Sequence, residues 1–238
     1  MQTQIRTHDS TLTQARQQAS TVFLAKVFNW MAIGLTLTGV VAYFVAASGM
    51  ARALIASPVF IILFLAELGL VFYFVARVER LQPATATGLF VGYAALNGVT
   101  LSVILLAYTN TSIAATFLVT AGMFAAMAVY GLVTKRDLSG WGSFLLMGAF
   151  GIFLAFVVNY YFLQSSTLDW AISGIGVLVF VGLTAYDVQK IKNIGENGIM
   201  TQGDAAIQKR AIIGALFLYL DFINLFLLLL HFFGVSRD

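Results

Sequence analysis

The chain consists of long apolar segments separated by short polar connections. Seven apolar runs lie at about 27–47, 58–76, 84–107, 112–133, 142–163, 168–191 and 205–233. A helix needs about 20 apolar residues to cross the hydrocarbon core of a bilayer, and each run is close to or above that length. The weakly alternating segments of about 10 residues that are typical of a transmembrane β-barrel are not seen. The pattern predicts an all-α, polytopic membrane protein with a bundle of seven transmembrane helices.

The polar positions divide the chain into two parts. Residues 1–26 are rich in Gln and Thr and predict a polar, cytoplasmic N-terminal tail, and residues 27–238 predict a single transmembrane domain. The tail lacks the apolar centre of a cleavable signal peptide. Composition supports the membrane class, because 60% of the residues are hydrophobic and only 10% are charged, against about 25% charged in soluble proteins.

The basic residues predict an orientation. Eleven of the 13 Lys and Arg residues lie in the tail and in the second, fourth and sixth connections, whereas only Arg52 and Arg237 lie on the other side. Cytoplasmic loops carry the excess of Lys and Arg, so the N-terminus is predicted to be cytoplasmic in an inner membrane. Seven spans place the C-terminus outside. A re-entrant last segment would leave six spans and return it to the cytoplasm, and the sequence leaves both arrangements open.

Two carboxyl groups stand out in the last two runs. Asp221 lies in the middle of the seventh run, and Asp187 lies near the end of the sixth. An ionised Asp at the centre of a membrane helix costs about 2.5–3.5 kcal/mol, so each is expected to be neutral, paired or facing water. Helical spacing places Asp221 beside Asn224 and Asp187 beside Thr184, on faces suited to the bundle interior.

We expect the two carboxyl groups to meet, because their helices are consecutive and joined by a short connection. Two adjacent carboxyl groups in a dry site would share one proton and change charge near neutral pH. When fully ionised, Asp187 and Asp221 would attract a hard cation such as Ca²⁺. The alternative is a purely structural role, in which each Asp caps or hydrogen-bonds a neighbour, and Asp187 pairs with Lys190 or Lys192.

Other polar residues in the apolar runs have two interpretations each. Glu67, midway along the second run, is either protonated and silent or part of an ion path. Arg77, ten residues later, either extends to the lipid headgroups or turns inward and clamps a carboxylate such as Asp187. Asn97 is sufficiently explained by an interhelical hydrogen bond.

Glycines inside the runs predict close helix packing, because small residues allow helices to approach where hydrophobicity provides no drive. They are Gly88, Gly92, Gly98, Gly148, Gly151, Gly174, Gly176 and Gly182.

Enzymatic chemistry is not indicated. There is no Cys, which excludes thiol nucleophiles and disulfides. Neither His-Glu-x-x-His, the zinc-protease motif, nor Gly-x-Ser-x-Gly, the hydrolase motif, is present. The two His residues, His8 and His231, lie at opposite ends of the chain. We therefore expect a protein that is not an enzyme and that binds no cofactor tightly.

Three motifs together resemble the bacterial inner-membrane branch of the Bax inhibitor family, the transmembrane Bax inhibitor motif proteins. They are Tyr219-Leu-Asp-Phe-Ile-Asn-Leu-Phe226, Tyr186-Asp187-x-Gln189-Lys190-Ile191-Lys192 and Lys135-Arg136-Asp137-Leu138-Ser139. The resemblance covers all seven runs. It implies a central last helix wrapped by the other six, and a pH-sensitive Ca²⁺ leak governed by an aspartate pair, here Asp187 and Asp221. It also implies a basic latch at the end of the second helix, near Arg77.

Two functions follow as hypotheses. The first is a pH-sensitive leak channel or transporter for Ca²⁺ or another cation, gated by Asp187 and Asp221, with Arg77, Glu67 and Asn224 in supporting positions and with Ca²⁺ or H⁺ as the transported ion. The second is a non-transporting membrane protein that regulates or contacts an inner-membrane AAA quality-control protease, a role with which some bacterial relatives are associated. Both place the chain in the lipid bilayer and neither involves nucleic acid.

Overall fold

The computed structural model describes residues 2–197, 199 and 202–237, and within these residues every regular element is a helix. Seven helical segments are long and apolar enough to cross a membrane. The elements are α1 (Gln2–Ala47), α2 (Met50–Ile55), α3 (Val59–Arg77), η1 (Val78–Arg80), α4 (Pro83–Leu101), α5 (Ile104–Ala107), α6 (Asn110–Val133), α7 (Ser139–Val158), η2 (Asn159–Leu163), α8 (Ser166–Glu196) and α9 (Asp204–Phe233). The predicted all-α, seven-span membrane fold is confirmed.

Helix starts follow local chemistry. Pro58 directly precedes α3, and Pro83 is the first residue of α4, where the missing N–H of proline costs nothing. The hydroxyls of Thr109 and Ser165 accept hydrogen bonds from the backbone at the starts of α6 and α8. These caps satisfy N–H groups that a helix leaves without an internal partner.

The first helix differs from the prediction. We expected a tail over 1–26 and a first span at 27–47, but α1 is continuous from Gln2, and its membrane-spanning part begins at Gln17. Ser20, Phe23 and Val27 are all buried in the bundle. No Pro or Gly interrupts the sequence between residue 2 and Gly34, so nothing in the polar segment ends the helix. A hydropathy pattern identifies only the apolar part of α1 and not the polar turns that precede it.

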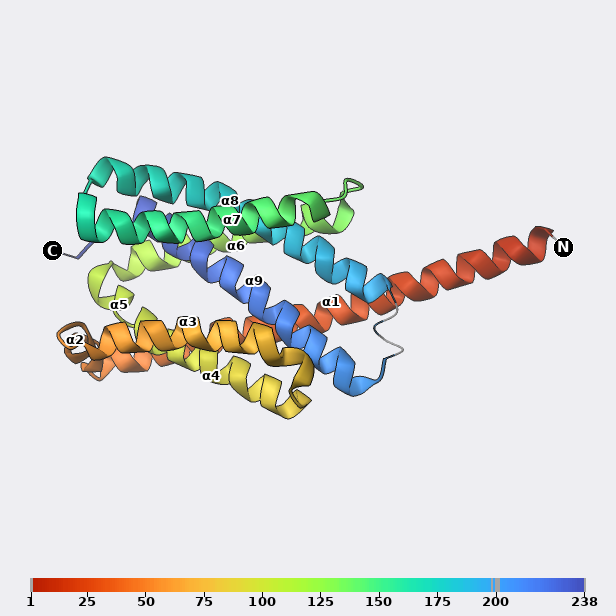
Figure 1. Cartoon of the computed structure of the whole chain (residues 1–238), viewed down its shortest axis with the longest axis horizontal. Helices are drawn as coiled ribbons and strands as arrows, with labels where there is room; N and C mark the ends of the chain where they lie inside the picture. Colours follow the sequence, from red (N-terminus) through yellow and green to blue (C-terminus); the bar gives the residue numbers. More distant parts are fainter. Residues whose placement is uncertain (1, 198, 200–201, 238) are drawn as a thin grey trace.

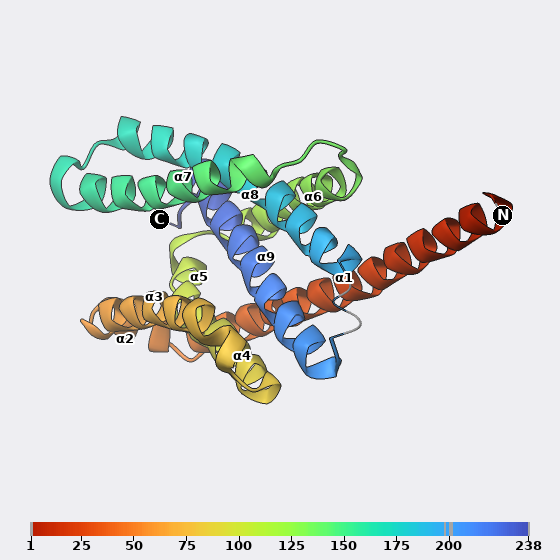
Figure 2. The ribbon, with the colours of Figure 1, turned by 45° about the vertical axis from the view of Figure 1, so that its right-hand side comes forward.

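The last helix is the centre of the bundle, as the family resemblance implied. The spans differ in the share of buried residues within an 18-residue apolar stretch. This share is 72% in α9 and 11–39% in the other six spans. Helix α9 packs against α1, α4, α6 and α8. Figures 1 and 2 show it crossing obliquely between the α3–α4 pair on one side and α7 and α8 on the other.

The chain ends lie at opposite ends of the bundle (Figure 1). Because α9 is one unbroken helix from Asp204 to Phe233, the last segment is a complete span and not a re-entrant one. The seven-span arrangement is therefore the one found, and the six-span alternative is wrong. Which end faces the cytoplasm stays a prediction from the basic residues.

Glycines mark some of the close helix contacts, but not all that were predicted. A methyl group on Gly98 would lie 2.7 Å from the carbonyl oxygen of Thr38, and one on Gly176 would lie 2.9 Å from Leu228. By contrast, Gly88, Gly92 and Gly151 have no such neighbour within 4 Å. The packing interpretation is confirmed for the first two and wrong for the other three.

Candidate functional site

Asp187 on α8 and Asp221 on α9 lie together in the interior of the bundle. Their carboxyl groups lie close enough to act on each other as charges and as hydrogen-bond partners, and they are only 9% and 4% exposed. The expected meeting of the two carboxyl groups is therefore what the structure has. Two carboxyl groups at this range can form a hydrogen bond with each other only when one of them carries a proton.

The packing of α8 against α9 explains why the two carboxyl groups meet. The helices run in opposite directions and form the most extensive helix pair in the described part of the chain. Gly176 allows α8 to approach Leu228 on one side of the pair, and Gly214 allows α9 to approach Ile191 on the other. Close contacts therefore bracket the two aspartates and hold the helices at short range.

One oxygen of the pair has no protein partner. Asp221 Oδ2 is buried and accepts no hydrogen bond from any described residue, a condition it shares with Ser173 Oγ. Burying a polar group without a hydrogen bond costs about 1–3 kcal/mol in proteins. Such a cost is retained where the unpartnered atom has another use, for instance towards a proton or a passing cation.

The alternative salt bridge at Asp187 is not formed. Lys190 is the cation whose charge acts on Asp187, but its ammonium group lies over the rings of Tyr186 and Phe217, at 5.7 and 5.5 Å from their centroids. Lys192 instead donates to the carbonyl oxygen of Leu132 and pairs with Glu196. Neither lysine forms an ion pair with Asp187 among the described residues.

Arg77, the latch candidate, lies at the surface and not at this pair. It is exposed at the end of α3 and joins no ion pair within the part of the chain that the structure describes. The tie between this end of α3 and the central helix is made by other residues, which sequence reasoning missed. Glu79 accepts from Arg210 at 2.8 Å through its carboxylate and from Lys209 at 3.0 Å through its carbonyl oxygen.

Glu67 belongs to a second buried polar cluster. Its carboxylate accepts hydrogen bonds from Thr100 Oγ1 at 2.7 Å and from Asn97 Nδ2 at 3.3 Å. Tyr219 donates its hydroxyl to Asn97 Oδ1 at 3.1 Å and lies 2.7 Å from Thr38 Oγ1. The cluster links α1, α3, α4 and α9. The expected interhelical hydrogen bond of Asn97 is confirmed, whereas Thr38, Thr100 and the Tyr219 hydroxyl were not singled out from the sequence.

Asn224 does not contact the aspartate pair. Its amide donates to the carbonyl oxygen of Leu220 in its own helix at 2.8 Å. It lines a cavity of about 520 Å³ together with His231, Phe64 and Phe156. Since Asn224 lies about one helical turn from Asp221, the cavity approaches the pair from the end of the bundle that carries the C-terminus.

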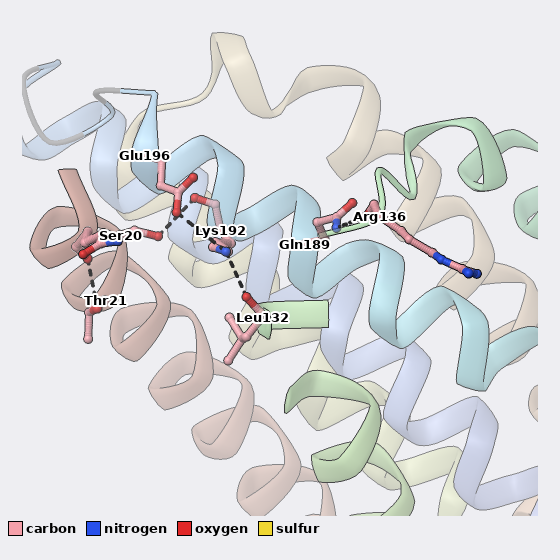
Figure 3. A network of polar contacts seen from close by, with 8 residues as sticks. Ser20, Thr21, Leu132, Arg136, Gln189, Lys192 and Glu196 are labelled. Atoms are coloured by element: carbon pink, nitrogen blue, oxygen red, sulfur yellow. Dashed lines mark hydrogen bonds and ion pairs between the residues drawn. The ribbon is translucent and has the colours of Figure 1, made fainter. Parts of the chain in front are cut away.

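Beyond the pair, the other end of α8 is tied firmly to its neighbours (Figure 3). Gln189 Nε2 donates to the carbonyl oxygen of Arg136, and Gln189 Oε1 accepts from the backbone of Leu138, both at 2.8 Å. Lys192 bonds the last turn of α6 through Leu132, and Ser20 of α1 donates to the carbonyl oxygen of Lys192. Three elements thus hold the helix end that follows Asp187.

The two carboxyl groups of the pair are few ligands for a metal ion. No group of three or more His, Cys, Asp or Glu side chains capable of holding a metal occurs in the residues that were described. Ca²⁺ takes six to eight oxygen ligands, so two carboxyl groups would need carbonyl or water oxygens to complete a shell. The arrangement suits a passing cation or a proton better than a permanently bound one.

Comparisons with known proteins agree with the motifs. The family model described as inhibitor of apoptosis-promoting Bax1 matches residues 20–238. The inner membrane protein YbhL of Escherichia coli K12 is 52% identical over 217 residues, which cover 90% of this chain and 92% of that protein. An uncharacterized protein of Borreliella burgdorferi is 46% identical over 232 residues, covering 95% and 98% of the two chains. An uncharacterized membrane protein of Streptococcus pyogenes is 37% identical over 218 residues, covering 89% and 92%.

Proposed function

Because this chain belongs to the Bax inhibitor family, we propose that it is an inner-membrane protein that lets cations, Ca²⁺ foremost, pass down their gradient under the control of Asp187 and Asp221. The observation that carries the proposal is the close, buried aspartate pair between α8 and the central helix, with one buried oxygen that accepts no hydrogen bond from a described donor. Intramembrane carboxyl groups facing a bundle interior commonly mark ion or proton pathways.

The control acts through the shared proton. With one proton between them, Asp187 and Asp221 attract each other through a hydrogen bond, which holds α8 against α9. When that proton leaves, two like charges face each other in a site of low polarity and repel. The repulsion loosens the contact between the helices, and the two charges then attract a divalent cation. Flux is therefore expected to be low in acid and to rise with pH.

Support for a closed resting form comes from the surroundings of the pair. The cavity at Asn224 lies on the side of the pair that faces the C-terminal end of α9. On the other side, towards the predicted cytoplasm, the buried side chains of Val188, Ile191 and Leu218 fill the space between the helices. Ions that enter by the cavity could pass only when this apolar barrier opens. The separation of α8 and α9 would open it.

The direct test is Ca²⁺ flux into proteoliposomes with Asp187→Asn and Asp221→Asn. Each substitution removes one of two charges that face the ion. At an effective dielectric constant of about 20, a charge at about 4 Å contributes roughly 4 kcal/mol. We therefore expect flux above neutral pH to fall by at least about tenfold in each variant. Wild-type flux in both variants would contradict the proposal.

Asp137→Asn is the matched control. Asp137 is exposed at the start of α7, where hydrogen bonds from the side chain and backbone of Ser139 lower the pKa of its carboxyl group. It therefore stays ionised through the pH range of the flux assay. Its substitution removes one carboxylate outside the spans without touching the pair, and flux should stay at the wild-type level.

A second candidate function is that of a partner or regulator of an inner-membrane AAA protease. One observation favours it: the N-terminal part of α1 projects away from the bundle as a free-standing helix (Figure 1), and the family match begins only at residue 20. Deleting residues 2–16 keeps the buried Ser20 and Phe23 and should therefore leave the bundle folded.

The deletion separates the two functions. If the projecting helix contacts the protease, the deletion should change the turnover of protease substrates in cells while Ca²⁺ flux of the purified protein is unaffected. Unchanged turnover would exclude a contact made through residues 2–16. A deletion that abolishes flux would instead assign this helix to the transport machinery.

A further inference from the structure

An apolar groove lies on the outside of the bundle at the end that carries the C-terminus. It has a volume of about 680 Å³ and runs between the last turns of α1, the short helix α5 and the first turns of α6. Tyr43, Phe117 and Leu118 form its walls and are 64%, 44% and 71% exposed. Since these residues belong to membrane-spanning helices, the groove opens towards lipid and not towards another part of the protein.

A single cation is fixed at the groove. Arg237 lines it together with Asn110, and its guanidinium donates through Nη2 to Asn110 Oδ1 at 2.6 Å. Its backbone N–H donates to the carbonyl oxygen of Ala107 at 2.9 Å. A guanidinium carries five N–H donors in a planar fork, so the bond to Asn110 orients the group and leaves most of its donors available.

The segment that carries Arg237 is itself strapped to the bundle. Thr109 donates its N–H to the carbonyl oxygen of Val235 at 3.1 Å, and Val235 donates to Ser112 Oγ at 3.0 Å. Gly234 is in such close contact with the ring of Tyr108 that a side chain there would collide with it. The position of the guanidinium is therefore set by the fold, which distinguishes it from a basic residue on a loose chain end.

We propose that this groove binds one anionic phospholipid, with the headgroup phosphate on Arg237 and an acyl chain along the apolar walls. A guanidinium matches a phosphate through paired N–H bonds. None of the described residues that line the groove is acidic, so within that part of the chain the ammonium group of a zwitterionic lipid would find no counter-charge. The net negative charge of phosphatidylglycerol is the better complement.

The groove also continues to the central helix. A smaller pocket of about 140 Å³ shares Leu105, Ile113 and Phe117 with it, and this pocket reaches Phe222 and Phe226 of α9. Phe222 directly follows Asp221 in the chain. An acyl chain that follows the pocket therefore touches the helix that carries half of the aspartate pair. The inference stands on this geometry alone and does not depend on the proposed transport.

The test is retention of defined lipids by the full-length protein. The purified chain is exchanged into detergent with equal amounts of dioleoyl phosphatidylglycerol and dioleoyl phosphatidylcholine, and bound lipid is counted by native mass spectrometry. We expect one tightly held lipid with about a fivefold preference for phosphatidylglycerol, the contribution of one basic side chain near anionic lipid. Arg237→Gln should abolish the preference. Arg52→Gln, at the other basic residue of this side and outside the groove, should keep it.

A second variant covers the case in which Arg237→Gln loosens the strap. Ala114→Trp fills the groove but leaves Arg237 and its hydrogen bonds in place, and it should release the retained lipid. An unchanged preference in Arg237→Gln, or full retention in Ala114→Trp, would overturn the proposal. Inorganic phosphate that displaces the lipid completely at low millimolar concentration would also overturn it, because the site would then recognise a free anion and not a lipid.

Discussion

Three intramembrane carboxyl groups differ in how well their oxygens are satisfied. Both oxygens of Glu67 accept hydrogen bonds, from Thr100 and Asn97. Asp187 and Asp221 instead face each other at close range, and Asp221 Oδ2 accepts no hydrogen bond from a described donor. A fully satisfied buried network stabilises a fold, whereas an unsatisfied member calls for another use. At the scale of single residues, this difference indicates a stabilising role for Glu67 and agrees with the gating role that we propose for the aspartate pair.

Glu67→Ala is therefore predicted to act on stability. The substitution leaves the buried Asn97 amide without its acceptor, which costs about 1–3 kcal/mol, while Thr100 keeps its bond to the carbonyl oxygen of Asn97. Thermal unfolding in detergent should show a lower midpoint, while the pH dependence of Ca²⁺ flux persists in the protein that remains folded. Glu67→Gln keeps an acceptor oxygen and is the matched control. A lost pH response with an unchanged unfolding midpoint would instead move Glu67 into the ion path.

Helix contacts depend on a few close approaches whose positions are visible only in the structure. Gly131 on α6 lies against the backbone of Ala185 on α8, so a methyl group there would meet the carbonyl oxygen of Ala185. Gly122 on the same helix has no such neighbour within 4 Å. Ala185 is two residues before Asp187, so the contact of α6 with α8 also supports the position of the aspartate pair.

Gly131→Ala should thus destabilise the protein, whereas Gly122→Ala should not. Overpacking of this kind typically lowers the free energy of unfolding by about 1–3 kcal/mol. The methyl group of Gly131→Ala would meet backbone atoms, which cannot move aside by rotating as a side chain can. Chemical denaturation followed by circular dichroism measures the difference. Equal stability of the two variants would show that α6 and α8 can separate without cost and would weaken the account of how Asp187 is held.

The same glycines show what the sequence could and could not predict about the helices. Spacing and apolar length predicted six of the seven spans to within a few residues, because both are local properties of the chain. Whether Gly98 or Gly92 meets another helix depends on the rotation of each helix against its neighbours, which no local pattern encodes. The early start of α1 was missed because its polar first turns do not lie in the apolar run.

For the whole molecule, the aspartate pair was predictable, but its surroundings were not. Two acidic residues in consecutive membrane helices have few arrangements that avoid lipid, so Asp187 and Asp221 were expected to meet. The tie of Glu79 to Arg210 and the C-terminal strap at Arg237 join residues far apart in the chain. Arg77 had two interpretations, extension to the lipid headgroups or an inward turn towards Asp187, and its exposure at the surface agrees with the first.

The molecule as a whole is a central helix held at several points along its length. One end of α9 is tied through Arg210 to Glu79 of η1, directly after α3, and the middle carries Asp221 against α8. The far end continues into the strap that carries Arg237. A loss of the shared proton at the middle of such a helix changes the interaction on which the contact with α8 depends, and the tied ends keep the rest of the bundle in place.

The measurement that tests the central claim most directly is Ca²⁺ flux into proteoliposomes between about pH 6 and 8, with wild type beside Asp221→Asn. A pair that shares a proton changes charge near neutrality, so wild-type flux should rise across this range. Asp221→Asn cannot form the doubly charged state, and its flux should stay low and flat. Absence of flux at every pH, or the same pH dependence in the variant, would contradict the account.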